Sequence, residues 1–181
     1  LSAQGFSRIG EKVSVAVQYK GFAYPEYTIV SPDGRGKGTF SPREMAAGAG
    51  IAYRISDVLS AGVNVRLVRS TLAEDANGSA VGADVALKYE KDALQAGLSV
   101  DNIGTPVKYG NVSYSQPMRA RAGVAYSLKG LTLSTEADYY LKGALSAGIG
   151  AEYTLSGLVS LRAGYRYGNS ALTTASHVSL G

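Results

Sequence analysis

The chain has 181 residues, of which 45% are apolar and 18% charged, and its formal net charge is +4. The length fits a single domain over residues 1–181, and the small, dispersed charge excludes a polybasic nucleic-acid binder. No cysteine is present, which excludes disulfides and thiolate metal sites, and no apolar run reaches the roughly 18 residues of a transmembrane helix. We expect truncation at both ends, because the sequence opens at Leu1 without Met and stops in mid-pattern.

Apolar and polar residues alternate through most of the chain, which is the period of a β-strand, and no convincing helical period is present. Most of the predicted strands are longer than the roughly five or six residues of a typical globular sheet. In chain order we predict about ten strands: 11–20, 43–55, 59–70, 79–90, 94–101, 118–128, 131–140, 144–155, 159–167 and 175–181.

The connections between these strands are short at one end of the sheet and mostly long at the other. Short turns are predicted at Ser56-Asp57, Lys91-Asp92, Lys129-Gly130 and Ser156-Gly157, and long connections at 21–42, 71–78, 102–117 and 168–174. The exception is the brief link at 141–143. This asymmetry is typical of an all-β, antiparallel up-and-down transmembrane β-barrel.

One face of each predicted strand carries an apolar set without a charged residue, for example Met45 to Ile55 by twos and Leu59 to Leu67 by twos, and Ile51, Val63, Val124 and Ile149 are members of such sets. A soluble antiparallel sheet shows the same alternation, but its inner face needs large side chains to fill a core. The apolar face here is rich in Ala, which suffices where lipid tails supply the packing. We therefore predict that this face is directed towards lipid.

Tyrosines on the apolar face lie at one level, shortly before the short turns. Tyr side chains favour the boundary between lipid and water, with the ring in lipid and the hydroxyl in water. Tyr19, Tyr139 and Tyr167 form a candidate second belt towards the long connections. The predicted membrane-interface belt consists of Tyr53, Tyr89, Tyr126 and Tyr153.

The opposite face is polar and rich in Gly and Ser, and we predict that it faces a lumen. The tight turns fix the register, which places Arg121 opposite Asp138, Gly123 opposite Glu136 and Glu152 opposite Arg162. Opposite charges across a ladder stabilise it by less than about 1 kcal/mol each, so we expect a paired and mostly structural network. Its members are Arg119, Arg121, Glu136, Asp138, Glu152, Arg162 and Arg166.

No catalytic or metal-binding motif emerges from the sequence. His177 is the only histidine, which excludes a histidine-based triad or metal cluster built within the chain. The Glu136–Asp138 carboxylates have arginines nearby, which favours an ion network over an acid/base pair. The Gly-containing stretches 31–38 and 75–78 are better interpreted as exposed turns than as phosphate or calcium loops. We expect no enzyme and no cofactor.

Three stretches resemble the PorV/PorQ family: "GTFSPREMAAG" at 38–48, "LSVDNIGTPVKYG" at 98–110 and "VSLRAGYR" at 159–166. The resemblance implies a barrel related to long-chain fatty-acid transporters, typically fourteen-stranded, in a Bacteroidetes-type Gram-negative outer membrane. It also implies a role in type IX secretion, with the secretion translocon, cargo proteins and surface attachment proteins as partners. None of these motifs contains a catalytic residue.

Four functions remain open at this point. The preferred hypothesis is a non-enzymatic outer-membrane subunit of protein secretion that binds partners or shuttles cargo through its long loops, in contact with outer-membrane lipid. The alternative is an outer-membrane transporter for hydrophobic small molecules such as fatty acids, against which the polar inner face argues mildly. A soluble β-barrel or sandwich that binds a ligand, and a pore-forming channel, are the other two.

Overall fold

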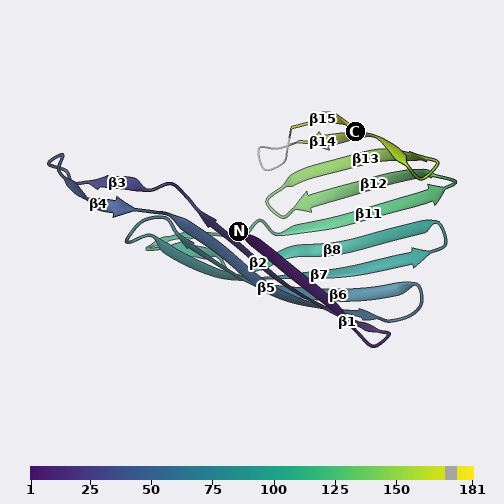
Figure 1. Ribbon diagram of the computed structural model, residues 1–181, viewed down its shortest axis with the longest axis horizontal. Helices are drawn as coiled ribbons and strands as arrows, with labels where there is room; N and C mark the ends of the chain where they lie inside the picture. Colours follow the sequence, from purple (N-terminus) through teal and green to yellow (C-terminus); the bar gives the residue numbers. More distant parts are fainter. Residues whose placement is uncertain (170–174) are drawn as a thin grey trace. The chain divides into compact units, whose positions relative to one another are not determined.

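The computed structural model describes residues 1–169 and 175–181, and the predicted connection 168–174 lies largely outside the described residues. The described chain consists of strands and turns, and the predicted all-β antiparallel fold is confirmed (Figure 1). The strands are β1 (Ser2–Ile9), β2 (Val13–Ala23), β3 (Tyr27–Val30), β4 (Gly36–Phe40), β5 (Arg43–Arg54), β6 (Leu59–Thr71), β7 (Asn77–Lys91), β8 (Leu94–Gly104), β9 (Val107–Tyr109), β10 (Val112–Tyr114), β11 (Arg119–Leu128), β12 (Leu131–Tyr140), β13 (Ala144–Leu155), β14 (Val159–Gly168) and β15 (His177–Leu180).

Eleven of the strands form one sheet in the order β1-β2-β5-β6-β7-β8-β11-β12-β13-β14-β15. Each strand of this sheet therefore lies beside the next strand of the same sheet along the chain, as in an up-and-down meander (Figure 1). The hairpins β3–β4 and β9–β10 are separate two-stranded sheets. The backbone divides into two compact units: the first is 1–51, 64–83 and 103–116, and the second is 52–63, 84–102 and 117–181.

The ten predicted strands are all present, and the structure adds β1, β3, β4, β9 and β10. Strand β1 was missed because its sequence, SAQGFSRI, has no sustained apolar alternation. The other four are only three to five residues long and lie within the stretches 21–42 and 102–117, which were predicted as long loops. The two long connections are therefore present, and each contains a short hairpin that the sequence did not predict.

The register of β11–β14 follows from two tight turns. Lys129 and Gly130 have φ values of 45° and 86°, the combination of a type I′ turn, and they leave Leu128 opposite Leu131. Ser156 and Gly157 also have positive φ, in a three-residue loop between Leu155 and Val159. The three predicted cross-strand pairs, Arg121–Asp138, Gly123–Glu136 and Glu152–Arg162, are confirmed.

The described residues form almost no apolar core of their own. Among the described residues, the only buried hydrophobic side chains are Ala80 and Ala144. Ile51, Val63, Val124 and Ile149 are 50%, 41%, 45% and 64% exposed. Apolar side chains left in water over such an area would forgo the main driving force of folding, so this face requires an apolar environment. No helix in the described part of the chain is long and apolar enough to cross a bilayer.

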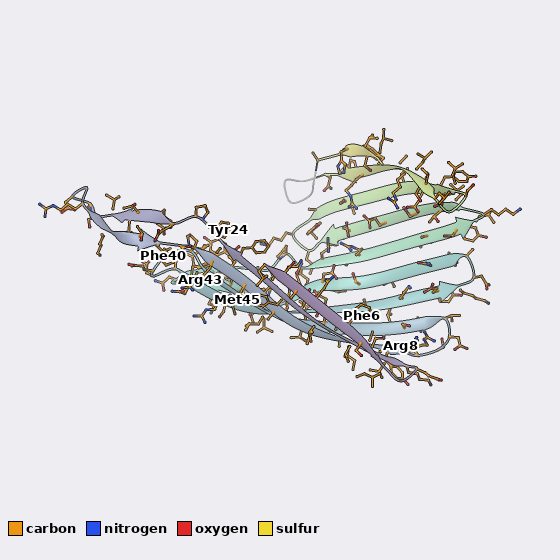
Figure 2. All side chains as sticks on the ribbon, viewed as in Figure 1. Phe6, Arg8, Tyr24, Phe40, Arg43 and Met45 are labelled. Carbon is orange, nitrogen blue, oxygen red and sulfur yellow. The ribbon has the colours of Figure 1, made fainter. Side chains whose placement is uncertain are left out.

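The hairpin β3–β4 lies beyond the ends of β2 and β5 in the first unit, with Tyr24 and Phe40 near its base (Figures 1 and 2). The rings of Tyr27 and Phe40, a cross-strand pair, have their centroids 5.9 Å apart. At the base, Tyr24 Oη donates to Glu44 Oε2 at 2.9 Å, and this hydrogen bond to a carboxylate raises the pKa of Tyr24. The long connection 21–42 is therefore an ordered projection.

Candidate functional site

The register of the second unit arranges its polar side chains in rows that run across the strands. Each row contains one residue from each neighbouring strand, all on the face opposite the apolar one. Three rows carry most of the charge: Asp101–Arg119–Tyr140; Ser99–Arg121–Asp138–Ser146; and Gly97–Gly123–Glu136–Gly148–Arg166–His177.

Asp138 on β12 is the centre of the predicted charged network. Its side chain is only 4% exposed, and its two carboxylate oxygens accept from different strands. Arg121 Nε on β11 donates to Asp138 Oδ1 at 2.7 Å, and Arg166 Nη1 on β14 donates to Oδ2 at 3.1 Å. Arg119 Nη1 lies 4.0 Å from Oδ1. A buried carboxylate is stable only when it is paired in this way, so Asp138 joins three strands.

Arg166 reaches Asp138 across an intervening strand because that strand carries no bulky side chain there. Gly148 on β13 pairs with Glu136 on one side and with Arg166 on the other. The Arg166 guanidinium forms an ion pair with Glu136 across this glycine, and its Nη1 also donates to Ser146 Oγ at 2.9 Å. The small residues of β13 therefore allow β12 and β14 to interact directly.

The remaining predicted members form two pairs at the edges of this cluster. Arg162 Nε donates to Glu152 Oε2, in a pair whose side chains are 63% and 38% exposed. Arg119 Nη2 donates to Asp101 Oδ2 at 2.8 Å, and its guanidinium carbon lies 5.8 Å from the centroid of the Tyr140 ring. All seven predicted residues are thus paired, and their assignment to a lumen stays a prediction.

The sequence reasoning missed three members of the network: Asp101, Ser146 and Tyr140. Asp101 is the last residue of a predicted strand, and the alternation along that strand places it on the polar face. The sequence alone could therefore have identified it. Including it, the network contains equal numbers of arginines and carboxylates, and its charges cancel. Ser146 and Tyr140 carry no charge, and only the register shows their involvement.

Beside this network, the glycine-rich part of β12–β15 forms a shallow polar groove of about 380 Å³. Its floor is Gly148, Gly150 and Gly164, and Glu152, Arg162 and His177 are among the polar residues that line it. His177 Nδ1 lies 2.9 Å from the Ala175 carbonyl oxygen. In the described part of the chain, no group of three or more metal-ligating side chains comes together. The groove offers hydrogen bonds and paired charges.

In the first unit, the hairpin β9–β10 covers part of the polar face of β7. Val81 belongs to the apolar face, so Gly78, Ala80 and Gly82 belong to the opposite one, and all three are buried. A Cβ at Gly78 would stand 2.7 Å from a Val107 methyl and 2.9 Å from the Tyr109 ring. The predicted loop 102–117 is therefore folded over the polar side of the sheet. The absence of a side chain at Gly78 leaves the space that Val107 and Tyr109 occupy.

The two ends of this hairpin are held by backbone-directed contacts. Asn102 has a positive φ of 62°, and its side-chain amide donates to the Pro117 carbonyl oxygen at 2.8 Å. A Cβ at Gly104 would overlap the Val81 carbonyl oxygen, so only glycine fits where the chain leaves β8. Gln116 Nε2 donates to the carbonyl oxygens of Val81 and Thr105 at 2.9 and 2.8 Å. These contacts give the "DNIGTP" stretch a structural role.

The predicted tyrosine belt lies at strand ends beside the short turns. Tyr53, Tyr126 and Tyr153 are 47%, 50% and 45% exposed, and Tyr89 is half-buried. Their rings are available to surrounding lipid, as the prediction requires. That they lie at a membrane interface stays a prediction.

No model of a known protein family and no curated protein matches the chain. Among solved structures, the chain is similar to one described as "TodX deltaS2S3 mutant monoaromatic hydrocarbon channel", with a TM-score of 0.61 and 14% sequence identity. The match covers 99% of this chain and 72% of that chain. The likeness is one of fold, that of a membrane β-barrel, and the eleven-stranded sheet of this chain is not closed among the described residues.

A second structure, described as "Unveiling the Mechanism Behind the in-meso Crystallization of Membrane Proteins", is similar with a TM-score of 0.46 and 13% identity, over 99% of this chain and 78% of that chain. This likeness is too low to support an argument. The resemblance to the PorV/PorQ family has no support from these comparisons and stays a prediction.

Proposed function

We propose that this chain is a non-enzymatic outer-membrane channel protein that admits small hydrophobic compounds. The exposed apolar face and the fold shared with the TodX hydrocarbon channel support a place in a membrane. The function was the alternative in the sequence analysis, where the polar inner face argued against it.

The observation that carries the proposal is the apolar surface that β9–β10 adds to the polar face of β7. Val107 and Tyr109 lie against Gly78, while Val112 and Tyr114 are 53% and 57% exposed. The Tyr109 and Tyr114 rings meet edge to face with centroids 6.0 Å apart. An apolar and aromatic surface of this kind suits a hydrocarbon better than the charged rows of the second unit do.

Uptake by intact Gram-negative cells tests the proposal, because the polysaccharide coat of their outer membrane slows hydrocarbons. Radiolabelled toluene and oleate are the probes, in a strain without its own channels for such compounds, and a disaccharide of similar mass to oleate is the polar control. We expect expression of this chain to raise toluene or oleate uptake and to leave disaccharide uptake unchanged. Equal uptake with and without the inserted chain, or an equal rise for the disaccharide, would refute the proposal.

A matched pair of variants connects this uptake to the hairpin. Val112→Ser with Tyr114→Ser replaces the two most exposed apolar side chains of the hairpin, which share a face with Val107 and Tyr109, and leaves its attachment through Asn102 and Gln116 unchanged. We expect hydrocarbon uptake to fall towards that of cells without the chain. Val30→Ser on β3–β4 is the control, because the Val30 side chain is similarly exposed, at 59%, and this variant should leave uptake unchanged.

The secretion hypothesis is the second candidate, and the observation that favours it is the projecting hairpin β3–β4. Its exposed Tyr27 and Val30 offer a contact surface to a translocon, cargo or attachment protein in a Bacteroidetes-type outer membrane. Deleting residues 27–40 should then abolish co-purification of such partners and leave hydrocarbon uptake intact. A chain that always purifies alone from its native membrane would count against this candidate.

A further inference from the structure

Two arginines lie on the otherwise apolar face of the first unit, at the end from which β3–β4 projects. The alternation that places Met45 and Leu67 on this face continues to Arg43 on β5 and Arg69 on β6. Figure 2 shows Arg43 and Met45 near the base of the hairpin. The charge-free band therefore ends at this level in a pair of cations.

Arg43 and Arg69 line one cavity of about 670 Å³ in this unit. Tyr19, Gly21 and Met45 also line it, and so does Asn77. The cavity thus has an apolar lining towards the charge-free band and a cationic one beyond it. That combination matches an amphiphile, with an acyl chain on one side and an anionic head on the other.

Tyr19 marks the level at which the surroundings change from apolar to polar. A Cβ at Gly21 would stand 2.9 Å from the Tyr19 hydroxyl, so the ring runs along β2 towards the hairpin end and lies over the glycine. The end of β2 lies beside the start of β5, because the Tyr24 amide donates to the Pro42 carbonyl oxygen at 2.9 Å. A tyrosine in lipid directs its hydroxyl towards the headgroups, and arginines reach the same level by extending their stems.

The two guanidinium groups have no ion-pair partner among the described residues, and both side chains are exposed. Glu44, which follows Arg43 in the chain, also lines the cavity, but its carboxylate accepts from Tyr24 Oη at 2.9 Å and from Ser70 Oγ at 3.1 Å and pairs with neither arginine. Unneutralised guanidinium groups form strong, charge-assisted hydrogen bonds with phosphate oxygens. The cavity therefore favours an anion at this level.

We propose that Arg43 and Arg69 bind the phosphate of an anionic membrane lipid whose acyl chain lies along Met45 and Tyr19. The proposal rests on the membrane location in the proposed function and is independent of which compound, if any, the channel admits. The site lies on the face opposite to β9–β10, so the lipid is a bound neighbour of the sheet and not a transported substrate.

Native mass spectrometry of the detergent-solubilised chain, with phosphatidylglycerol and phosphatidylcholine added in equal amounts, tests this site. We expect the chain to retain phosphatidylglycerol preferentially. Arg43→Gln with Arg69→Gln should reduce that preference by about fivefold per arginine, about 25-fold in all, the effect of two cations beside an anionic surface. Arg43→Lys with Arg69→Lys keeps the charge and should retain most of the preference.

The control variant is Arg8→Gln with Lys12→Gln, which removes the same charge near the β1–β2 turn, where Figure 2 places Arg8. It should bind lipid like the original chain. Equal retention of the two lipids, or a preference that survives Arg43→Gln with Arg69→Gln, would overturn the proposal. Release of the lipid by 10 mM inorganic phosphate would also overturn it, in favour of a site for free phosphate. Hydrocarbon uptake, measured separately, decides the proposed function whatever the outcome here.

Discussion

Replacing Asp138 by Asn tests whether the charged network holds strands β11, β12 and β14 together. The substitution keeps the size of the side chain and removes the charge that Arg121 and Arg166 share. Removing one partner of a buried ion pair costs about 3–5 kcal/mol, because the other charge is left uncompensated. Here Arg121 and Arg166 are 42% and 31% exposed, and water compensates part of the loss. We therefore expect the free energy of unfolding to fall by about 2–3 kcal/mol.

Glu152→Gln is the matched control, because it removes a carboxylate of the same network from a far more exposed pair. The Glu152 and Arg162 side chains are 38% and 63% exposed, and such a pair contributes less than about 1 kcal/mol. Raising the salt concentration should weaken the Glu152 pair and leave the Asp138 contribution largely intact.

The assay is urea unfolding of the chain in phospholipid vesicles, followed by far-ultraviolet circular dichroism because the chain contains no tryptophan. The double variant Asp138→Asn with Arg121→Gln should lose less stability than the sum of the two single changes, since it removes one of the guanidinium groups that Asp138→Asn leaves without a partner, while Arg166 keeps Glu136. If Asp138→Asn destabilised the chain no more than Glu152→Gln, Asp138 would not be the centre of the network and the reasoning would be refuted.

Three further predictions use the same unfolding assay. Gly104→Ala should lower the free energy of unfolding by about 2 kcal/mol or more, because its Cβ would overlap the backbone of β7. The control Gly97→Ala, whose Cβ would stand 3.8 Å from its nearest atom, should be nearly neutral, and equal effects of the two variants would contradict the close approach at Gly104. Gly148→Ala should be tolerated, because its Cβ would meet its neighbours at 3.5 Å or more. Gly148→Leu should abolish the Arg166–Glu136 ion pair that crosses this glycine and so destabilise the chain, and equal stability of the two variants would contradict this reasoning. Tyr126→Ala should cost about 1–2 kcal/mol in vesicles and Tyr126→Phe less than half of that, as expected of a ring in lipid; no loss on Tyr126→Ala would count against the belt.

The sequence predicted the sheet well because period-two alternation and turn chemistry are local signals. Lys129-Gly130 fixed the register of β11 and β12, and the pairing of Arg121 with Asp138 followed from counting back from that turn. The same counting cannot show that Arg166 contacts Asp138, since that contact crosses a whole strand and depends on the small side chains at Ser146 and Gly148.

That the hairpin β9–β10 folds over the polar face could not be predicted from the sequence, for a different reason. Loops between strands of this kind are usually external, and nothing in the composition of 102–117 distinguishes an inward fold. The decisive features are the positive φ of Asn102 and the missing side chains at Gly78 and Gly104, whose meaning depends on distant parts of the chain. The unneutralised Arg43 and Arg69 were also overlooked, because the charge-free band was taken to end before them.

The attachment of β9–β10 has a consequence for how such a protein diversifies. Two of its anchors, Gly104 and Gln116, contact the carbonyl oxygen of Val81 on β7, and this backbone atom is the same whatever side chain the position carries. The stretch between the anchors can therefore change in length and composition without altering the register of a single transmembrane strand. Under the proposed function, a hairpin exchanged between related proteins at these anchors should carry its preference for hydrophobic compounds with it.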